Sequence, residues 1–179
     1  MENIILKASW YARQAHEGQK RKYNNTPYWL HPARVAGLVS GYTDDERVVA
    51  AAWLHDVAED TANTCEDISK EFGKFVADNV FWLTKLKLDD VARFQRMQIY
   101  HQQLTIVQRA AEDAAHNEWM VAPSTLIKLA DRYDNLRELD HEDDFYKLYV
   151  KETHHLLDSL DVGHELVDLI KTWIGPKYE

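Results

Sequence analysis

The chain has 179 residues and a formal net charge of −9, from 21 Lys and Arg against 30 Asp and Glu. This length predicts a single domain over residues 1–179. The acidic balance argues against nucleic acid polymers and anionic membranes as partners, because phosphate contacts need clustered cations. No apolar run approaches 18 residues and no leader pattern precedes the first helix, so we expect neither a membrane span nor a signal peptide. The single cysteine, Cys65, fits a reducing compartment, and we expect a cytoplasmic protein.

The first part of the chain predicts a helix and a basic loop. Gly and Pro are few, and apolar residues recur at spacings of three and four, which predicts an all-α fold. A first helix is expected over residues 2–17 and a polar loop over residues 18–28. The loop contains Lys20, Arg21 and Lys22, and this local positive charge on an acidic protein suits a small anionic ligand better than a polymer.

The next two helices are predicted from their N-terminal signals. Pro32 suits the first position of a helix, which places His31 at the N-cap. Thr43 and Glu46 have the spacing of a capping box, so a third helix is expected to run from there to Asp60.

The remaining helices follow at regular intervals. Thr64 is expected to cap a short helix that ends at Gly73, and another helix follows over residues 75–85. A mostly polar helical stretch spans about residues 88–117. Ser124 is expected to cap a helix, and two more, at about residues 143–160 and 163–174, complete a helical bundle.

One turn of the third predicted helix carries a charge cluster. His55 and Glu59 are four residues apart, as are Asp56 and Asp60, so all four side chains project from neighbouring strips of one surface. Carboxylates at this spacing repel by roughly 0.2–0.5 kcal/mol per pair unless a cation compensates them. An imidazole among carboxylates suggests that the cation is a metal. The alternative is a solvated acidic face, which the continuous apolar run at residues 48–54 disfavours.

A further carboxylate lies on the helix that begins near Ser124. Asp131 shares one side of this helix with Lys128, Arg132 and Asn135, and it could complete a site with the His55 and Asp56 face. The alternative for Asp131 is a surface ion pair with Lys128. His31 taken alone would more often be a capping or core histidine than a ligand.

The order of these residues carries a family resemblance. His31, then His55 with Asp56, then Asp131, resembles the signature of the HD phosphohydrolase superfamily. Five phrases are similar to the hydrolase domain of Rel/SpoT alarmone enzymes and the small alarmone hydrolases of the metazoan SpoT homologue type. They are A-x-x-A-H-E-G-Q-x-R-K at 12–22, read loosely, P-Y-x-x-H-P-x-x-V-A at 27–36, A-A-x-L-H-D-x-x-E-D-T at 51–61, F-G at 72–73 and L-x-K-L-A-D-R-x-x-N-L-R at 126–137.

The resemblance implies an HD-domain helical bundle with one metal. By matching positions, His31, His55, Asp56 and Asp131 would hold one divalent ion, most often Mn²⁺ in this family. The donor types themselves suit manganese, iron or zinc. Glu59 and Asp60 match the acidic pair that positions water or transfers protons.

The resemblance also implies a nucleotide site. Arg21 and Lys22 match the pair near the base and the phosphates, where a guanidinium can stack on a purine. Asn135 matches an asparagine that contacts the nucleotide. Tyr149 matches a nucleotide-packing tyrosine in a looser alignment, and helix packing is its alternative role.

The expected function is hydrolysis of a small nucleotide. The resemblance implies removal of the 3′-diphosphate from guanosine 3′,5′-bis(diphosphate) alarmones by metal-activated water, with no room in 179 residues for a synthetase region. One alternative is an HD phosphohydrolase that acts on another nucleotide, including NADPH. Another is a catalytically weak nucleotide-binding protein, which the intact Glu59 and Asp60 pair disfavours.

Overall fold

The computed structural model describes residues 3–86, 88, 90–115 and 120–176. In these residues the regular elements are helices, with one isolated β-bridge between Lys20 and Pro27. The all-α prediction is therefore confirmed. The chain forms two compact units, Met1–Thr84 and Lys85–Glu179. The expectation of one domain over the whole chain stays a prediction.

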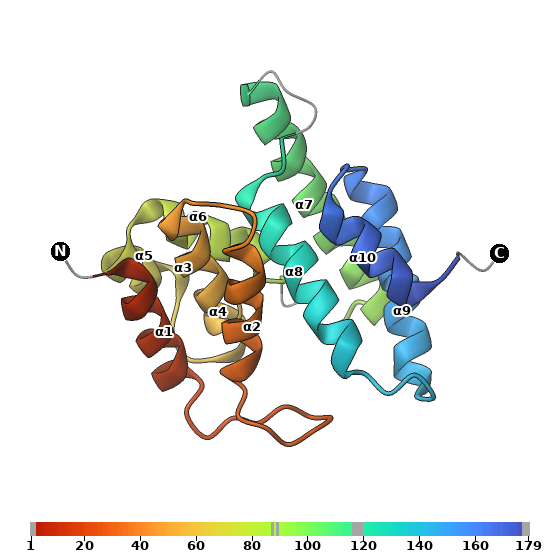
Figure 1. Ribbon diagram of the computed structural model, residues 1–179, viewed down its shortest axis with the longest axis horizontal. Helices are drawn as coiled ribbons and strands as arrows, with labels where there is room; N and C mark the ends of the chain where they lie inside the picture. The colour runs from red at the N-terminus through yellow and green to blue at the C-terminus, as the bar shows by residue number, and fades with distance from the viewer. Residues whose placement is uncertain (1–2, 87, 89, 116–119, 177–179) are drawn as a thin grey trace. The chain divides into compact units, whose positions relative to one another are not determined.

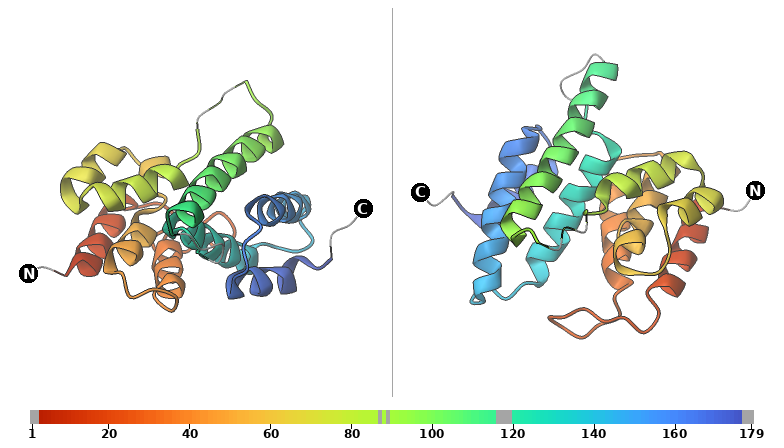
Figure 2. Two further views of the ribbon diagram at one scale, coloured as in Figure 1. Left: turned by 90° about the horizontal axis from the view of Figure 1, so that it is seen from above. Right: turned by 180° about the vertical axis from the view of Figure 1, so that it is seen from behind.

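The first unit is built around its third helix (Figure 1). Its helices are α1 (Ile4–Ala15), α2 (Leu30–Val39), α3 (Glu46–Leu54), α4 (Val57–Asp60), α5 (Cys65–Phe72) and α6 (Lys74–Leu83). Helix α3 packs against α1, α2 and α6, and α5 packs against α6 (Figure 2). Every α3 residue from Val48 to Ala52 is buried, as is Leu54. The buried helix α3 therefore leads directly to His55, which is itself buried.

Helix α2 begins earlier than its proline suggested. It starts at Leu30 with Trp29 as the N-cap, so His31 is its second residue, and the predicted N-cap position of His31 is wrong. Pro32 is tolerated in this first turn because the N–H groups there have no acceptor within the helix. His31 N–H instead donates to the carbonyl of Tyr28 at 2.9 Å.

The predicted third helix is two helices, and its capping residue is different. Asp45 caps α3 by accepting from the N–H of Arg47 at 2.9 Å, so the predicted capping box is wrong. The helix then breaks at His55 and Asp56, and α4 follows. Asp56 has φ −98° and ψ −6°, a bridge-region conformation that departs from regular helix.

The short α5 has the ends that the sequence predicts. Thr64 and Asp67 form a reciprocal capping box at its start. Gly73 ends it with φ 85°, a conformation that glycine adopts at little cost. These signals are local, since each depends on hydrogen bonds within a few residues.

The described part of the second unit contains four helices, of which α7 is the longest at 23 residues. They are α7 (Arg93–Ala115), α8 (Pro123–Glu138), α9 (Asp144–Leu160) and α10 (Glu165–Ile174). Helix α7 packs against α8 and α9, and α10 packs against the same two helices. Ser124 does not cap α8, because Ala122 is the N-cap and Pro123 takes the first position. Among the described residues, no helix is long and apolar enough to cross a membrane.

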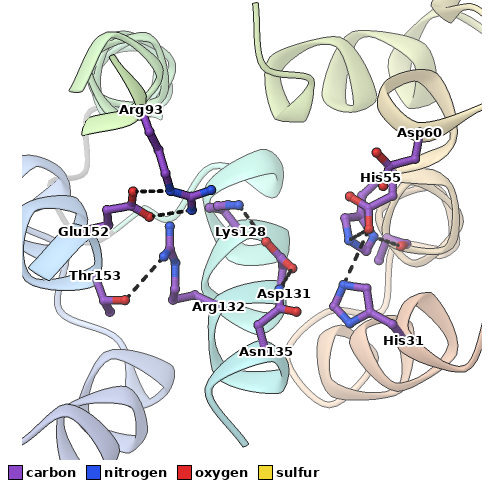
Figure 3. Close-up of polar contacts among 12 residues, drawn as sticks. His31, His55, Asp60, Arg93, Lys128, Asp131, Arg132, Asn135, Glu152 and Thr153 are labelled. Atoms are coloured by element: carbon purple, nitrogen blue, oxygen red, sulfur yellow. Dashed lines mark hydrogen bonds and ion pairs between the residues drawn. The ribbon is translucent and has the colours of Figure 1, made fainter. Parts of the chain in front are cut away.

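The polar α7 is held in the second unit by buried polar contacts (Figure 3). Arg93 donates two hydrogen bonds to the fully buried carboxylate of Glu152, at 2.8 and 3.0 Å. His101 and His155 approach with their Nδ1 atoms 2.8 Å apart, one ring donating to the other. Burial, together with Arg132 and Lys128, lowers the pKa of His101 to about 2, so its imidazole is neutral.

Candidate metal centre

Three of the predicted metal ligands meet in the first unit. His31 comes from α2, while His55 and Asp56 form the break between α3 and α4. The Asp56 Oδ2 atom lies 3.2 Å from Nε2 of His55 and 3.6 Å from Nε2 of His31. One ligand atom from each residue lies within 4.8 Å of the others. Both imidazoles are almost completely buried, with 1% and 3% exposure.

The break after α3 also fixes the orientation of one imidazole. His55 Nδ1 lies 2.7 Å from the carbonyl oxygen of Ala52, and an imidazole must donate its N–H in such a contact. In the neutral imidazole the lone pair of His55 is therefore on Nε2, the atom that faces Asp56. A backbone partner of this kind sets the tautomer of metal-binding histidines in general.

The donor set fits a divalent cation. Donors bonded to one ion at about 2.1 Å are roughly 3 Å apart at right angles and about 4.2 Å apart when opposite. The separations between Asp56 Oδ2 and the two imidazole nitrogens fall in this range. Two imidazole nitrogens and a carboxylate oxygen are ligands that suit manganese, iron or zinc, so the residues support a metal but do not select one.

A tyrosine connects this group to the acidic pair of α4. The Tyr28 hydroxyl lies 2.8 Å from Asp56 Oδ2 and 2.8 Å from Asp60 Oδ2. Burial is the main cause that raises the pKa of Tyr28, and the two carboxylates add to it, so the hydroxyl stays protonated and donates. Asp60 is exposed and Glu59 is half-buried. The i to i+4 spacing survives the helix break, because Asp60 N–H still donates to the Asp56 carbonyl at 2.9 Å.

Sequence reasoning did not select Tyr28 as a functional residue. The Tyr28 ring stacks on the His16 imidazole with 4.7 Å between the ring centres. Gln19 contacts both His16 and Asp60, which are the neighbours of the Tyr28 ring and hydroxyl. The Gln19 side chain bonds His16 Nδ1 at 2.8 Å and donates to the backbone oxygen of Asp60 at 2.9 Å. The available signal was the place of Tyr28 in the phrase that contains His31, three residues further on.

The two predicted nucleotide-binding cations of the loop differ in burial. Arg21 is only 9% exposed, and its guanidinium lies 5.5 Å from the centre of the Tyr28 ring. Arg21 also closes the loop, since its N–H donates to Thr26 O at 2.8 Å. Lys22 is exposed. Arg21 thus has a packing contact within the candidate site, which the polar loop sequence did not indicate.

The other predicted residues lie in the second unit. Asp131 is 6% exposed, and its two oxygens accept from Lys128 Nζ at 2.6 Å and from Asn135 Nδ2 at 2.5 Å (Figure 3). The Lys128 contact is therefore buried, where the sequence alternative was a surface ion pair. Tyr149 packs under Arg132, whose guanidinium is 4.1 Å from the ring centre. The metal role of Asp131 and the nucleotide roles of Asn135 and Tyr149 stay predictions.

A cavity of about 510 Å³ lies beside the basic loop and is separate from the three metal candidates. Its walls include Trp10, Arg13 and Trp29, together with His16 and Gln19. His31, His55 and Asp56 do not line it. His16, which stacks on Tyr28, and Gln19 thus form part of the wall of this cavity.

The sequence matches a known family over most of its length. A family model described as the HD domain matches residues 8–160. The chain belongs to the HD domain family. The candidate metal centre of His31, His55 and Asp56 lies within the matched residues of this HD domain.

Curated relatives of this HD domain are much longer proteins. A GTP pyrophosphokinase of Myxococcus xanthus is 32% identical over 181 residues, covering 99% of this chain and 22% of the relative. A guanosine-3′,5′-bis(diphosphate) 3′-pyrophosphohydrolase of Haemophilus influenzae is 35% identical over 166 residues, covering 88% of this chain and 23% of the relative. The HD domain chain therefore spans less than a quarter of the length of these relatives.

Solved structures of similar size also match this HD domain. One is a metazoan orthologue of SpoT, described as hydrolysing ppGpp and acting in starvation responses, with a TM-score of 0.75 and 26% identity. That match covers 96% of both chains. A protein of Listeria monocytogenes matches with a TM-score of 0.60 and 26% identity, covering 82% of this chain and 94% of that one.

Proposed function

We propose that this HD domain protein is a metal-dependent pyrophosphohydrolase that removes the 3′-diphosphate from guanosine 3′,5′-bis(diphosphate) alarmones. The observation that carries the proposal is the buried group of His31, His55 and Asp56, connected through Tyr28 to the Asp60 carboxylate. The metazoan SpoT orthologue, which matches over nearly its full length, is described as hydrolysing ppGpp.

The proposed metal is a single divalent ion, and we favour Mn²⁺ on the family resemblance. Such an ion would lower the pKa of a bound water molecule and would place positive charge near the phosphates. His31, His55 and Asp56 would hold it, with Asp131 as the proposed fourth protein ligand. Asn135 would then orient the Asp131 carboxylate, since its amide already donates to Oδ1 of that residue.

The reaction needs two proton transfers at the scissile bond. Water attacks the phosphorus next to the 3′-oxygen of the ribose, and the bond between that phosphorus and the 3′-oxygen breaks. Glu59 and Asp60 are proposed to position the water, to accept its proton and to return a proton to the leaving 3′-oxygen. The products are guanosine 5′-diphosphate and pyrophosphate, so phosphorus and oxygen balance without a further reactant.

The loop cations are proposed to bind the nucleotide. The Arg21 guanidinium is planar and can stack on a purine while it rests on the Tyr28 ring. Lys22 is exposed beside it and would meet phosphate. Tyr149 is proposed to contribute to the same nucleotide site, and its ring also contacts Arg132 and Phe145.

A product-release assay across a nucleotide panel tests this function. The purified chain with Mn²⁺ would be given guanosine tetraphosphate, guanosine 3′-phosphates, NADPH and simple 5′-nucleotides. We expect release of pyrophosphate from the tetraphosphate at the highest kcat/KM. Faster phosphate release from NADPH or another nucleotide would assign a different phosphohydrolase activity, and tight binding without any release would assign a nucleotide-binding protein.

We expect Arg21→Ala to raise KM for the alarmone with little change in kcat. Loss of a stacked cation costs about 0.5–2 kcal/mol, or roughly 2- to 30-fold in affinity, and both ground-state and transition-state binding are lost. Arg21→Lys should recover only part, because an ammonium has charge but no stacking plane. Steady-state kinetics measure both constants.

A matched arginine controls for the packing role of Arg21. Arg13 is in the same unit, with its guanidinium 4.5 Å from the Trp29 ring, and is assigned no role in the site. Arg13→Ala should keep the parent KM. Equal KM values for the parent, Arg21→Ala and Arg21→Lys would remove Arg21 from the nucleotide site.

A further inference from the structure

Tyr28 is held in place by the backbone of the basic loop. Its N–H donates to Gln19 O at 2.9 Å, which closes the loop that carries Arg21. Its carbonyl accepts from His31 N–H at 2.9 Å in the turn that begins α2. The same short segment therefore sets the positions of Tyr28 and of one proposed metal ligand.

Aromatic contacts fix the Tyr28 ring as well. His16, which is 1% exposed, stacks on it with the ring planes inclined by 27°. His31 meets it edge-on at 6.1 Å, and the Arg21 guanidinium lies 5.5 Å from its centre. A ring held by three neighbours keeps its hydroxyl at a defined point, as a positioning role requires.

The Tyr28 hydroxyl contacts the carboxylate oxygen that also lies near both proposed histidine ligands. Asp56 Oδ2 faces both imidazole Nε2 atoms, and this same oxygen is the one that Tyr28 approaches at 2.8 Å. The second partner, Asp60 Oδ2, is at the same distance. A hydroxyl has one proton, so it donates to one of these carboxylates at a time.

We propose that Tyr28 is a positioning residue that couples occupancy of the metal centre to the placement of Asp60. This inference rests on the proposed function for the role of Asp60, and on the geometry alone for the contact with Asp56. When Asp56 Oδ2 shares its electrons with a cation, it becomes a weaker hydrogen-bond acceptor. The Tyr28 proton then favours Asp60 and holds that carboxylate at the site only while the cation is present.

Loss of the hydroxyl should affect two separate measurements. Without the hydroxyl, Asp56 is no longer held toward the two imidazoles before the cation binds, and removal of such orienting partners typically lowers metal affinity or activity 10- to 100-fold. Asp60 loses its anchor, so kcat should fall by about the same factor. The KM for the alarmone should change little, since Phe at this position keeps the ring on which Arg21 rests.

Tyr28→Phe tests the proposal, with Tyr11→Phe as the matched control. Tyr11 is in the same unit, and its hydroxyl donates to Asn63 Oδ1 at 3.0 Å, outside the metal group. Mn²⁺ affinity would be measured by electron paramagnetic resonance titration without substrate, with kcat, KM and the melting temperature alongside. We expect weaker Mn²⁺ binding and lower kcat in Tyr28→Phe, and parent values for both in Tyr11→Phe.

A double-mutant cycle distinguishes positioning from general loosening of the fold. If Tyr28 acts on catalysis through Asp60, Tyr28→Phe combined with Asp60→Asn should have the kcat of Asp60→Asn alone. Losses that multiply in the double variant, or unchanged Mn²⁺ affinity in Tyr28→Phe, would each overturn the proposal.

Failure of the proposed function would give different results from failure of the Tyr28 proposal. A parent protein that releases nothing from the alarmone refutes that function, and the cycle is then measured on the panel nucleotide that it does cleave. The Mn²⁺ titration needs no substrate. Unchanged affinity in Tyr28→Phe therefore refutes the coupling whatever the parent hydrolyses.

Discussion

Glu59→Gln and Asp60→Asn should each keep the metal and lose turnover by about 10²- to 10⁴-fold, the range typical when proton transfer is disabled. Each amide has the shape of the acid but neither its charge nor its basicity. Asn at position 60 still offers an oxygen to the Tyr28 hydroxyl, which lies 2.8 Å from the present carboxylate. Single-turnover rates with saturating alarmone and Mn²⁺ would measure the loss.

Two further measurements make this result specific. Metal content should remain at one ion per chain in both variants, because neither residue belongs to the group formed by His31, His55 and Asp56. Glu46→Gln, at the exposed first residue of α3, should turn over like the parent. Parent-like kcat in both Glu59→Gln and Asp60→Asn would end the proposed catalytic role of this pair.

The sequence predicted the candidate metal centre better than it predicted the helix that carries it. The i to i+4 argument for Asp56 and Asp60 assumed one continuous helix, whereas the chain breaks at His55 and Asp56. The i to i+4 spacing of Asp56 and Asp60 is nonetheless kept, because the Asp56 carbonyl still accepts from Asp60 N–H. A local hydrogen bond preserved the spacing that a regular helix would have given.

The capping errors had separate local causes. Thr43 and Ser124 are suitable N-cap types, whereas His31 was placed at an N-cap by Pro32, and in each case another residue is the N-cap. Asp45 accepts from Arg47 N–H in place of Thr43, and a turn of backbone hydrogen bonds precedes α2. Where the box was reciprocal, at Thr64 and Asp67, the prediction was confirmed.

Tyr28 shows what a pattern of residue types cannot reveal. Its proposed role depends on a hydroxyl that contacts Asp56, 28 residues away, and Asp60, 32 residues away. Residues this far apart are not neighbours on one helix or strand, so only the folded loop brings these groups together. Arg21 is a similar case. A basic residue in a polar loop is expected to be exposed, but in the folded loop Arg21 is buried against the Tyr28 ring.

Substitution of a proposed metal ligand should have the other large effect. In His31→Ala, the buried group loses one of its two imidazoles, and we expect metal content well below one ion per chain. The loss in affinity should exceed the 10- to 100-fold that is typical when only an orienting partner is removed. Elemental analysis after dialysis against Mn²⁺ would measure it, and hydrolysis should fall in proportion.

Asp131 needs a gentler substitution because it is also the partner of a buried lysine. Burial lowers the pKa of Lys128, and the nearby Asp131 carboxylate counteracts this, so Asp131→Ala would leave Lys128 buried without its anion. Breaking such a pair costs about 3–5 kcal/mol, which could unfold the second unit and mimic loss of a ligand. Asp131→Asn keeps an oxygen for Lys128 and removes the negative charge that a divalent ion requires.

We therefore expect Asp131→Asn to lower the melting temperature less than Asp131→Ala, because the amide oxygen still accepts from Lys128, while its metal content falls well below one ion per chain. Asp78→Ala is the matched control, since Asp78 is a half-exposed carboxylate paired with Lys74 in the first unit, and it should retain the full complement. A full complement in Asp131→Asn would remove Asp131 from the coordination shell and leave His31, His55 and Asp56 as the protein ligands. A shell of three protein ligands leaves more positions to water, so the same result would favour an ion held mainly by the first unit.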